Sequence, residues 1–283
     1  MSDYLIILFN GFASSKLWYD YAFEDKPLLR KLDFLDRLKE IGTTYTFNQV
    51  FFNINYYATP NTKKEQTLWK KIYDIYAPTT SNINFNLEDL DYKNICVNIY
   101  NVVKAKYGKN KKYIVIGHSY GGGLALLFSK MYKSHCILCC CIDNPPYTLE
   151  FFNKYNDKEN IHILDKYKTN SDLKKSLRII KNSPNVKEKN KEIDDVFKLI
   201  SCKSSLDRIK YYDSKLYTRT IFIRAIKPQK CDWNKYARLE KKSFDADKNL
   251  VSYVMLKGAE HFVWKKQEFS DVIIKQITNA LAD

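Results

Sequence analysis

The alternation of short apolar runs with longer amphipathic stretches is the feature that most constrains the fold of this chain. The runs of strand length are residues 4–9, 49–54, 113–116, 136–142, 220–224 and 251–256. Several of them are apolar at every position, as strands must be when helices cover both faces of a parallel sheet. The pattern therefore predicts an α/β domain with a mostly parallel sheet of about six strands.

Two helices are predicted between these strands. Residues 91–107 repeat apolar side chains at helical spacing, and Gly108 follows as a stop signal. Residues 120–133 are apolar almost throughout, which predicts a helix in the centre of the domain.

Residues 147–217 break the alternation, because they contain no strand-like run and include the polar segment 181–195. Residues 173–180 and 193–200 predict two or three short amphipathic helices. We therefore predict a helical cap or lid, inserted into a core formed by residues 1–146 and 218–283.

The net charge of +15 is carried mainly by lysine, since the chain of 283 residues has only seven arginines. The lysines are spread along the whole sequence, whereas nucleic-acid recognition favours arginine in concentrated patches. We expect no specific nucleic-acid partner, and only a weak attraction to anionic surfaces.

The seven cysteines include three consecutive ones, at positions 139, 140 and 141. Neighbouring residues of a strand point to opposite faces of its sheet, so this run does not form a disulfide framework. The expectation is a reducing, cytoplasmic location. No apolar run approaches the roughly 20 residues that a membrane span needs, and the acidic start does not fit a secretory signal.

The sequence Gly117-His-Ser-Tyr-Gly121 fits the pattern G-x-S-x-G and joins a predicted strand directly to a predicted helix. A serine hydroxyl becomes a useful nucleophile when a tight turn holds it out of the sheet beside a base. Glycines on either side allow the helix to pass close to the strand. The positive N-terminus of that helix favours a developing oxyanion. The motif predicts Ser119 as a nucleophile.

Among the four histidines, His261 is the candidate general base. It follows the last predicted strand, and open parallel sheets place their sites at the C-terminal ends of strands. His118 lies within the turn with its side chain directed away from the nucleophile. His135 precedes a strand, and His162 lies in the predicted insertion.

With these two motifs, the chain resembles the α/β-hydrolase superfamily, whose members order nucleophile, acid and histidine along the sequence. The resemblance covers most of the chain outside the insertion. It implies an oxyanion loop after the first strand, here Asn10-Gly-Phe-Ala13, with Asn10 in place of the family's histidine. The backbone N–H groups of Phe12 and Tyr120 would then be the oxyanion donors. Like thioesterase-type members, the chain begins at the strand that carries this loop.

Two aspartates are candidates for the acid. Asp232 follows the strand at 220–224, and its spacing to His261 resembles the usual family arrangement, although the loop is longer and Asp232 is also placed to cap a helix. Asp143 ends the strand at 136–142, where thioesterase members of the family carry their acid. The spacing favours Asp232 by a small margin.

The sequence thus predicts a serine hydrolase of the α/β-hydrolase fold that cleaves a carboxylic ester or thioester, with a fatty acyl group among the candidate substrates. The partner is a small ester or acyl substrate, and no motif for a cofactor or metal is present. Transfer of the acyl group to another acceptor, and a ligand-binding protein without turnover, are the alternatives.

Overall fold

A parallel sheet of six strands forms the centre of the molecule. The computed structural model describes residues 4–11, 19, 21–23, 29–49, 51–57, 83–145, 158–211, 215–226, 235–236, 238–241 and 250–282. The sheet has the order β4-β1-β5-β6-β7-β8, and each neighbouring pair is parallel. Its strands are β1 (Tyr4–Phe9), β4 (Thr43–Thr46), β5 (Lys112–His118), β6 (Cys136–Ile142), β7 (Arg219–Ile226) and β8 (Val251–Lys257). The predicted α/β architecture is confirmed.

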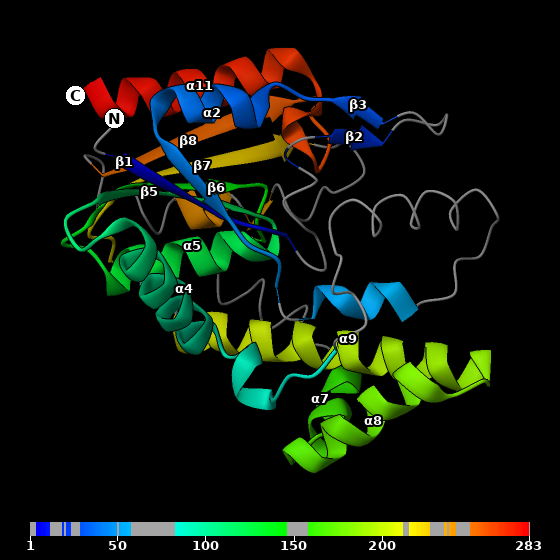
Figure 1. Cartoon of the computed structure of the whole chain (residues 1–283). Helices are drawn as coiled ribbons and strands as arrows, with labels where there is room; N and C mark the ends of the chain where they lie inside the picture. Colours follow the sequence, from blue (N-terminus) through cyan, green and yellow to red (C-terminus); the bar gives the residue numbers. More distant parts are fainter. Residues whose placement is uncertain are drawn as a thin grey trace.

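Helices cover both faces of this sheet (Figure 1). On one face lie α2 (Phe34–Ile41) and α11 (Gln267–Ala282), and on the other lie α4 (Tyr92–Tyr107) and α5 (Tyr120–Met131). Each layer encloses its own apolar core, which explains why the central strands are apolar on both sides.

The consecutive cysteines show how one strand serves both cores. Cys139 and Cys141 pack in the core beneath α4 and α5, whereas Cys140 packs in the core beneath α2 and α11. The described cysteines are free thiols, and all of them except Cys202 are buried. The run therefore fills space in a doubly covered strand, as its alternation predicts.

One predicted strand was wrong. The described residues of this run, 49 and 51–54, do not pair in the sheet. Phe51 lies in a turn and the 3₁₀ helix η1 (Phe52–Tyr57) follows it, while the preceding Thr43–Thr46 forms the strand β4. β4 is an edge strand whose side chains are exposed or half-buried, so it lacks an apolar run. The apolar signal at 49–54 includes Phe51 in the turn and Ile54 in η1, whose side chains are both buried in the core beneath α4 and α5.

The two helices predicted at 91–107 and 120–133 are confirmed by α4 and α5. The carboxylate of Asp91 caps α4 by accepting hydrogen bonds from the N–H groups of Lys93 and Asn94. Gly108 follows the helix with a φ of 88°, a conformation that favours glycine.

The remaining elements are short. β2 (Tyr21–Phe23) and β3 (Leu29–Lys31) form an antiparallel pair apart from the main sheet. The 3₁₀ helices η2 (Leu87–Leu90) and η4 (Val263–Lys265) precede α4 and α11 respectively.

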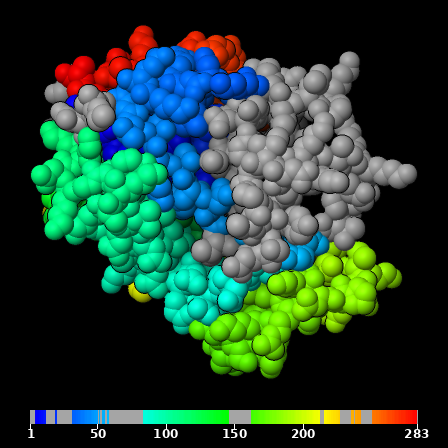
Figure 2. Space-filling view, in the orientation of Figure 1, coloured from blue at the N-terminus to red at the C-terminus, as the bar shows by residue number. Residues whose placement is uncertain are grey.

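Between β6 and β7, the described residues form three helices, α7 (Lys158–Lys166), α8 (Asn170–Asn182) and α9 (Val186–Lys210). The prediction of short helices was wrong for α9, which has 25 residues. Its buried positions continue at helical spacing to Arg208, which contacts Tyr120 at the start of α5. In Figure 2 the yellow-green surface of these helices lies at the lower edge of the molecule, beside the cyan segment that leads into α4.

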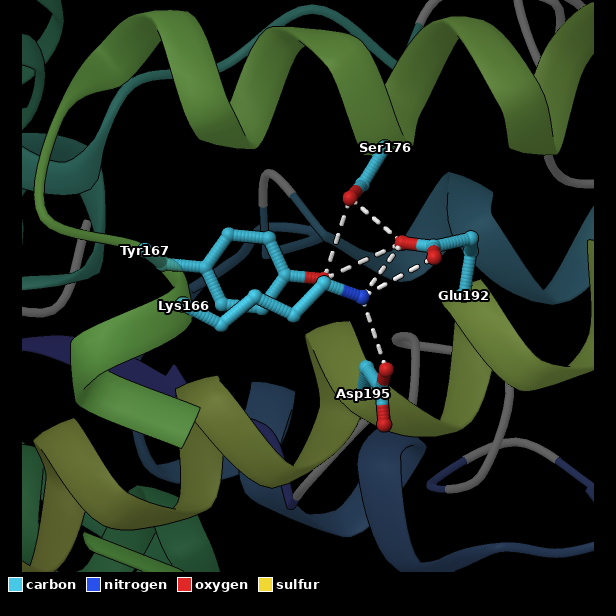
Figure 3. Close-up of polar contacts among 5 residues, drawn as sticks. All are labelled: Lys166, Tyr167, Ser176, Glu192 and Asp195. Atoms are coloured by element: carbon cyan, nitrogen blue, oxygen red, sulfur yellow. Dashed lines mark hydrogen bonds and ion pairs between the residues drawn. The ribbon is translucent and has the colours of Figure 1, made fainter. Parts of the chain in front are cut away.

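A polar cluster ties the three helices together (Figure 3). Lys166 Nζ at the end of α7 lies 2.9 Å from Glu192 Oε1 and 2.7 Å from Asp195 Oδ2, both on α9. The hydroxyl of Tyr167 donates to Ser176 of α8 at 3.1 Å, and Ser176 in turn donates to Glu192. These contacts fix α7 and α8 against the N-terminal half of α9.

Candidate active site

Ser119 occupies the sharp turn between β5 and α5. Its backbone has φ 52° and ψ −118°, a conformation that side-chain-bearing residues rarely adopt. A Cβ added at Gly117 would collide with the carbonyl of Gly121, and a Cβ at Gly121 would collide with the carbonyl of Phe9. The two glycines therefore permit the close crossing of strand and helix that forces Ser119 into this conformation.

Asp143 lies directly after β6 and has a φ of 41°. Among the described residues other than glycine, Ser119 and Asp143 are the two with a positive φ. The backbone N–H of Asp143 donates to the carbonyl of Ile223 at 2.7 Å. Its Oδ1 accepts a hydrogen bond from the N–H of Ala225 at 3.2 Å, so β7 holds both its main chain and its side chain. This anchoring directs the second carboxylate oxygen toward the loop after β8.

His261 lies on that loop. Its Nδ1 is 2.6 Å from Asp143 Oδ2, and its side chain is 29% exposed while that of Asp143 is 6% exposed. Since Nδ1 is engaged by the carboxylate, Nε2 is the ring nitrogen left to exchange a proton with a neighbouring group. Gly258, with φ 78°, allows the chain to leave β8 and form the loop.

The electrostatics keep Asp143 ionised. Burial raises the pKa of its carboxyl, but the hydrogen bond with His261 and the positive charge of Arg224 lower it by more, so the pKa lies below its ordinary value. An ionised, buried carboxylate beside Nδ1 stabilises a positive charge on the imidazole of His261.

The structure thus brings together three of the predicted residues at the C-terminal edge of the sheet: Ser119 after β5, Asp143 after β6 and His261 after β8. Asp232, the acid that the spacing favoured, and Phe12 lie outside the described residues. Tyr120 is the first residue of α5, and its carbonyl accepts a hydrogen bond from the Tyr92 hydroxyl at 3.2 Å.

Two buried groups that support this edge were not predicted from the sequence. Arg224, on β7, donates from Nη1 to the backbone and side-chain oxygens of Asn144, the residue after Asp143, and from Nη2 to Glu240 at 2.5 Å. Each of these three side chains is buried. A signal was present, because an arginine at the end of the apolar run 220–224 needs a buried partner.

The second missed group is His118, to which the motif gave no role. Its ring is buried, and its Nε2 lies 2.8 Å from the backbone oxygen of His261. Of the other histidines, His162 is exposed on α7, and His135 lies against the rings of Tyr100 and Tyr113.

The described residues contain no group of three or more His, Cys, Asp or Glu side chains arranged to hold a metal ion. They also contain no helix with both the length and the apolar character to cross a bilayer.

No family model matches the sequence, and no curated protein matches it. The peroxisomal alpha-beta-hydrolase of Saccharomyces cerevisiae superposes with a TM-score of 0.50 at 13% identity, over 99% of this chain and 78% of that one. The chain has the α/β-hydrolase fold.

Two other solved structures superpose over nearly the whole chain. A carboxylesterase of the thaumarchaeon Nitrososphaera gargenis superposes with a TM-score of 0.50 at 12% identity, over 99% of this chain and 92% of that one. NosK from Streptomyces actuosus superposes with a TM-score of 0.54 at 11% identity, over 98% of each chain. At these identities the likeness concerns the fold, and the chemistry has to be argued from the site.

Proposed function

We propose that this α/β-hydrolase-fold protein is a serine hydrolase that cleaves a carboxylic ester or thioester through an acyl-enzyme intermediate. The observation that carries the proposal is the 2.6 Å contact between His261 Nδ1 and Asp143 Oδ2, at the same sheet edge as the strained turn of Ser119. A strained residue, an oriented imidazole and a buried carboxylate in one place match the requirements of an activated serine.

Each residue has one role in this proposal. Ser119 Oγ attacks the carbonyl carbon of the substrate while His261 accepts its proton through Nε2. His261 then gives the proton to the leaving alcohol or thiol, and a water molecule repeats the sequence to release the acid. Asp143 fixes the ring tautomer and stabilises the imidazolium. We propose Asp143 rather than Asp232 as the acid because, within the described part of the chain, its carboxylate contacts His261.

The oxyanion of the tetrahedral intermediate would be bound by the backbone N–H groups of Tyr120 and Phe12. Tyr120 opens α5, so its amide belongs to the positive end of that helix. The assignment of Phe12 rests on the resemblance of Asn10-Gly-Phe-Ala13 to the oxyanion loop of the family.

The position of the acid bears on the substrate. In the resemblance described above, thioesterase members carry their acid at the end of the strand that corresponds to β6, which is where Asp143 lies. Acyl thioesters therefore stand first among the substrates to test, with acyl transfer as a variant of the same chemistry. We further propose that residues 147–217 act as the cap over the acyl group.

The test is labelling with a fluorophosphonate, followed by peptide mapping and a panel of acyl-CoAs and p-nitrophenyl esters. We expect modification at Ser119 alone, and a loss of labelling and turnover of several orders of magnitude in Ser119→Ala. A Ser119→Ala protein that hydrolyses the same substrate undiminished would contradict the proposal. Binding of acyl ligands without labelling or turnover would instead support the ligand-binding alternative.

A further inference from the structure

We propose that His118, the residue before Ser119, is a positioning residue that holds the main chain of His261 in place relative to the nucleophile. The inference rests on the proposed function, in which Ser119 and His261 act together. It adds a second restraint on the base, separate from the contact with Asp143.

The restraint is a hydrogen bond between two segments far apart in sequence. His118 Nε2 lies 2.8 Å from the backbone oxygen of His261. A carbonyl oxygen only accepts hydrogen bonds, so Nε2 of His118 carries the hydrogen. His118 is the last residue of β5, and the bond therefore joins the strand that leads into Ser119 to the loop that carries His261. Asp143 orients the ring of the base, and His118 anchors its main chain.

The surroundings of His118 keep this contact fixed. Its ring lies 4.5 Å from that of His261, 4.7 Å from Trp264 and 5.2 Å from Phe262, measured between centroids. The residue is only 2% exposed. Burial and the neighbouring His261 lower the pKa of His118 to about 3, so its ring is neutral near pH 7. A neutral ring also adds no positive charge next to the imidazolium that the proposed mechanism forms on His261.

The expected effect follows from geometry. A displacement of a catalytic group by about 1 Å can lower the rate about 100-fold. His118→Phe keeps a ring against Trp264 and Phe262 but removes the donor. We therefore expect kcat to fall about 10- to 100-fold with little change in KM, because the lost contact holds the base rather than the substrate.

Two further variants separate the hydrogen bond from the packing. In His118→Gln the amide nitrogen reaches the position of Nε2, so we expect it to recover most of the lost kcat. In His118→Asn the side chain is shorter and its nitrogen falls short of the carbonyl, so we expect no recovery. If His118→Phe does not fold, the contrast between Gln and Asn decides the question.

His135→Phe is the matched control. It is the same substitution at a half-buried histidine packed on tyrosine rings, beside Tyr113 at the opposite end of β5. We expect wild-type kcat there.

The experiment measures kcat, KM and the rate of fluorophosphonate labelling for each folded variant, on a substrate whose turnover depends on Ser119. A wild-type kcat in His118→Phe overturns the inference, and so does a His118→Gln protein that loses as much as His118→Asn. The wild-type protein is measured first. If it shows no labelling or turnover that depends on Ser119, the proposed function fails, and the inference fails with it for that separate reason.

Discussion

Two of the charge networks among the described residues differ in their access to water. At the sheet edge, the side chains of Arg224 and Glu240 form an ion pair at 2.5 Å and are 4% and 0% exposed. In the helices between β6 and β7, the side chain of Lys166 is 37% exposed, and those of its partners Glu192 and Asp195 are 13% and 16% exposed. Both networks join separate elements through similar groups.

This difference in exposure determines how much each network contributes to stability. Removing one partner of a buried ion pair leaves the other charge in a medium that solvates it poorly, whereas water replaces a lost partner at the surface. Arg224 also binds Asn144, directly after the proposed acid. We infer that losing a buried contact at the edge that carries Asp143 lowers the free energy of unfolding strongly. Losing a contact among the three helices lowers it less.

The largest predicted loss of stability is for Arg224→Met. The substitution removes the ion-pair partner of buried Glu240 and the donors to Asn144, so we expect a loss of about 3–5 kcal/mol in the free energy of unfolding. Chemical denaturation of the full chain measures it.

The double variant Arg224→Met with Glu240→Met is the control for this prediction. Because it removes both charges, it should be more stable than Arg224→Met alone. A loss below about 1 kcal/mol in Arg224→Met would show that the two networks do not differ as we infer.

A smaller effect is predicted for Asp207, a buried carboxyl near the end of α9 that accepts the N–H of Tyr92 at 2.8 Å. Burial raises the pKa of Asp207 from 3.8 to about 6. A raised carboxyl pKa means that the fold favours the protonated form. The stabilisation by protonated Asp207 is therefore fully present below about pH 4 and is lost as the pH rises through about 6.

Asp207→Asn should remove the loss of stability that ionisation of Asp207 causes at higher pH. The amide is neutral at every pH, and its oxygen still accepts the hydrogen bond from Tyr92. We expect a gain of stability on the order of 1 kcal/mol at pH 7.5, after allowance for partial solvent screening, and no gain at pH 4. Denaturation of both proteins at the two pH values measures it. An equal difference at both would show that the titration of Asp207 is not the cause.

The smallest effect is predicted for the exposed network. Partial burial lowers the pKa of Lys166, but the hydrogen bonds to Asp195 and Glu192 raise it by a larger amount. The pKa therefore lies above its ordinary value. Solvent screening nevertheless limits the effect of Lys166→Met to about 1 kcal/mol or less, and added salt should reduce it. Lys168→Met, at an exposed i,i+3 pair, is the control with no expected effect. A loss above about 2 kcal/mol in the free energy of unfolding of Lys166→Met would contradict the inference that this network contributes less to stability than the buried one.

The parts of this molecule that the sequence predicted are those with a local signal. β1 and β6 are apolar at every position, and the motif around Ser119 is contiguous in the sequence. The positions of both strands and of the turn were therefore predicted correctly. β4 was missed because an edge strand has no apolar run to reveal it. The buried turn beside it carried the apolar signal instead.

The pairing of His261 with Asp143 depends on non-local contacts. Asp143 lies 118 positions before His261, and its carboxylate is aimed by an N–H of β7 and by a positive φ. Spacing along the chain, which favoured Asp232, carries none of this information, and Asp232 itself lies outside the described residues. The contact from His118 to the carbonyl of His261 spans 143 positions and left no sequence signal beyond a histidine in the motif.

In the proposed mechanism, Asp143 is the acid that supports His261 as the base for Ser119. The most direct measurement is kcat of Asp143→Asn and Asp232→Asn on the same substrate. Asparagine keeps the shape of the side chain and can still accept the N–H of Ala225, so it tests the charge rather than the packing.

We predict that Asp143→Asn loses up to about 10⁴-fold in kcat, because the tautomer and the charge of His261 are no longer supported. Asp232→Asn should keep a kcat close to that of the wild type. A protein that loses its activity with Asp232→Asn and retains it with Asp143→Asn would contradict the account.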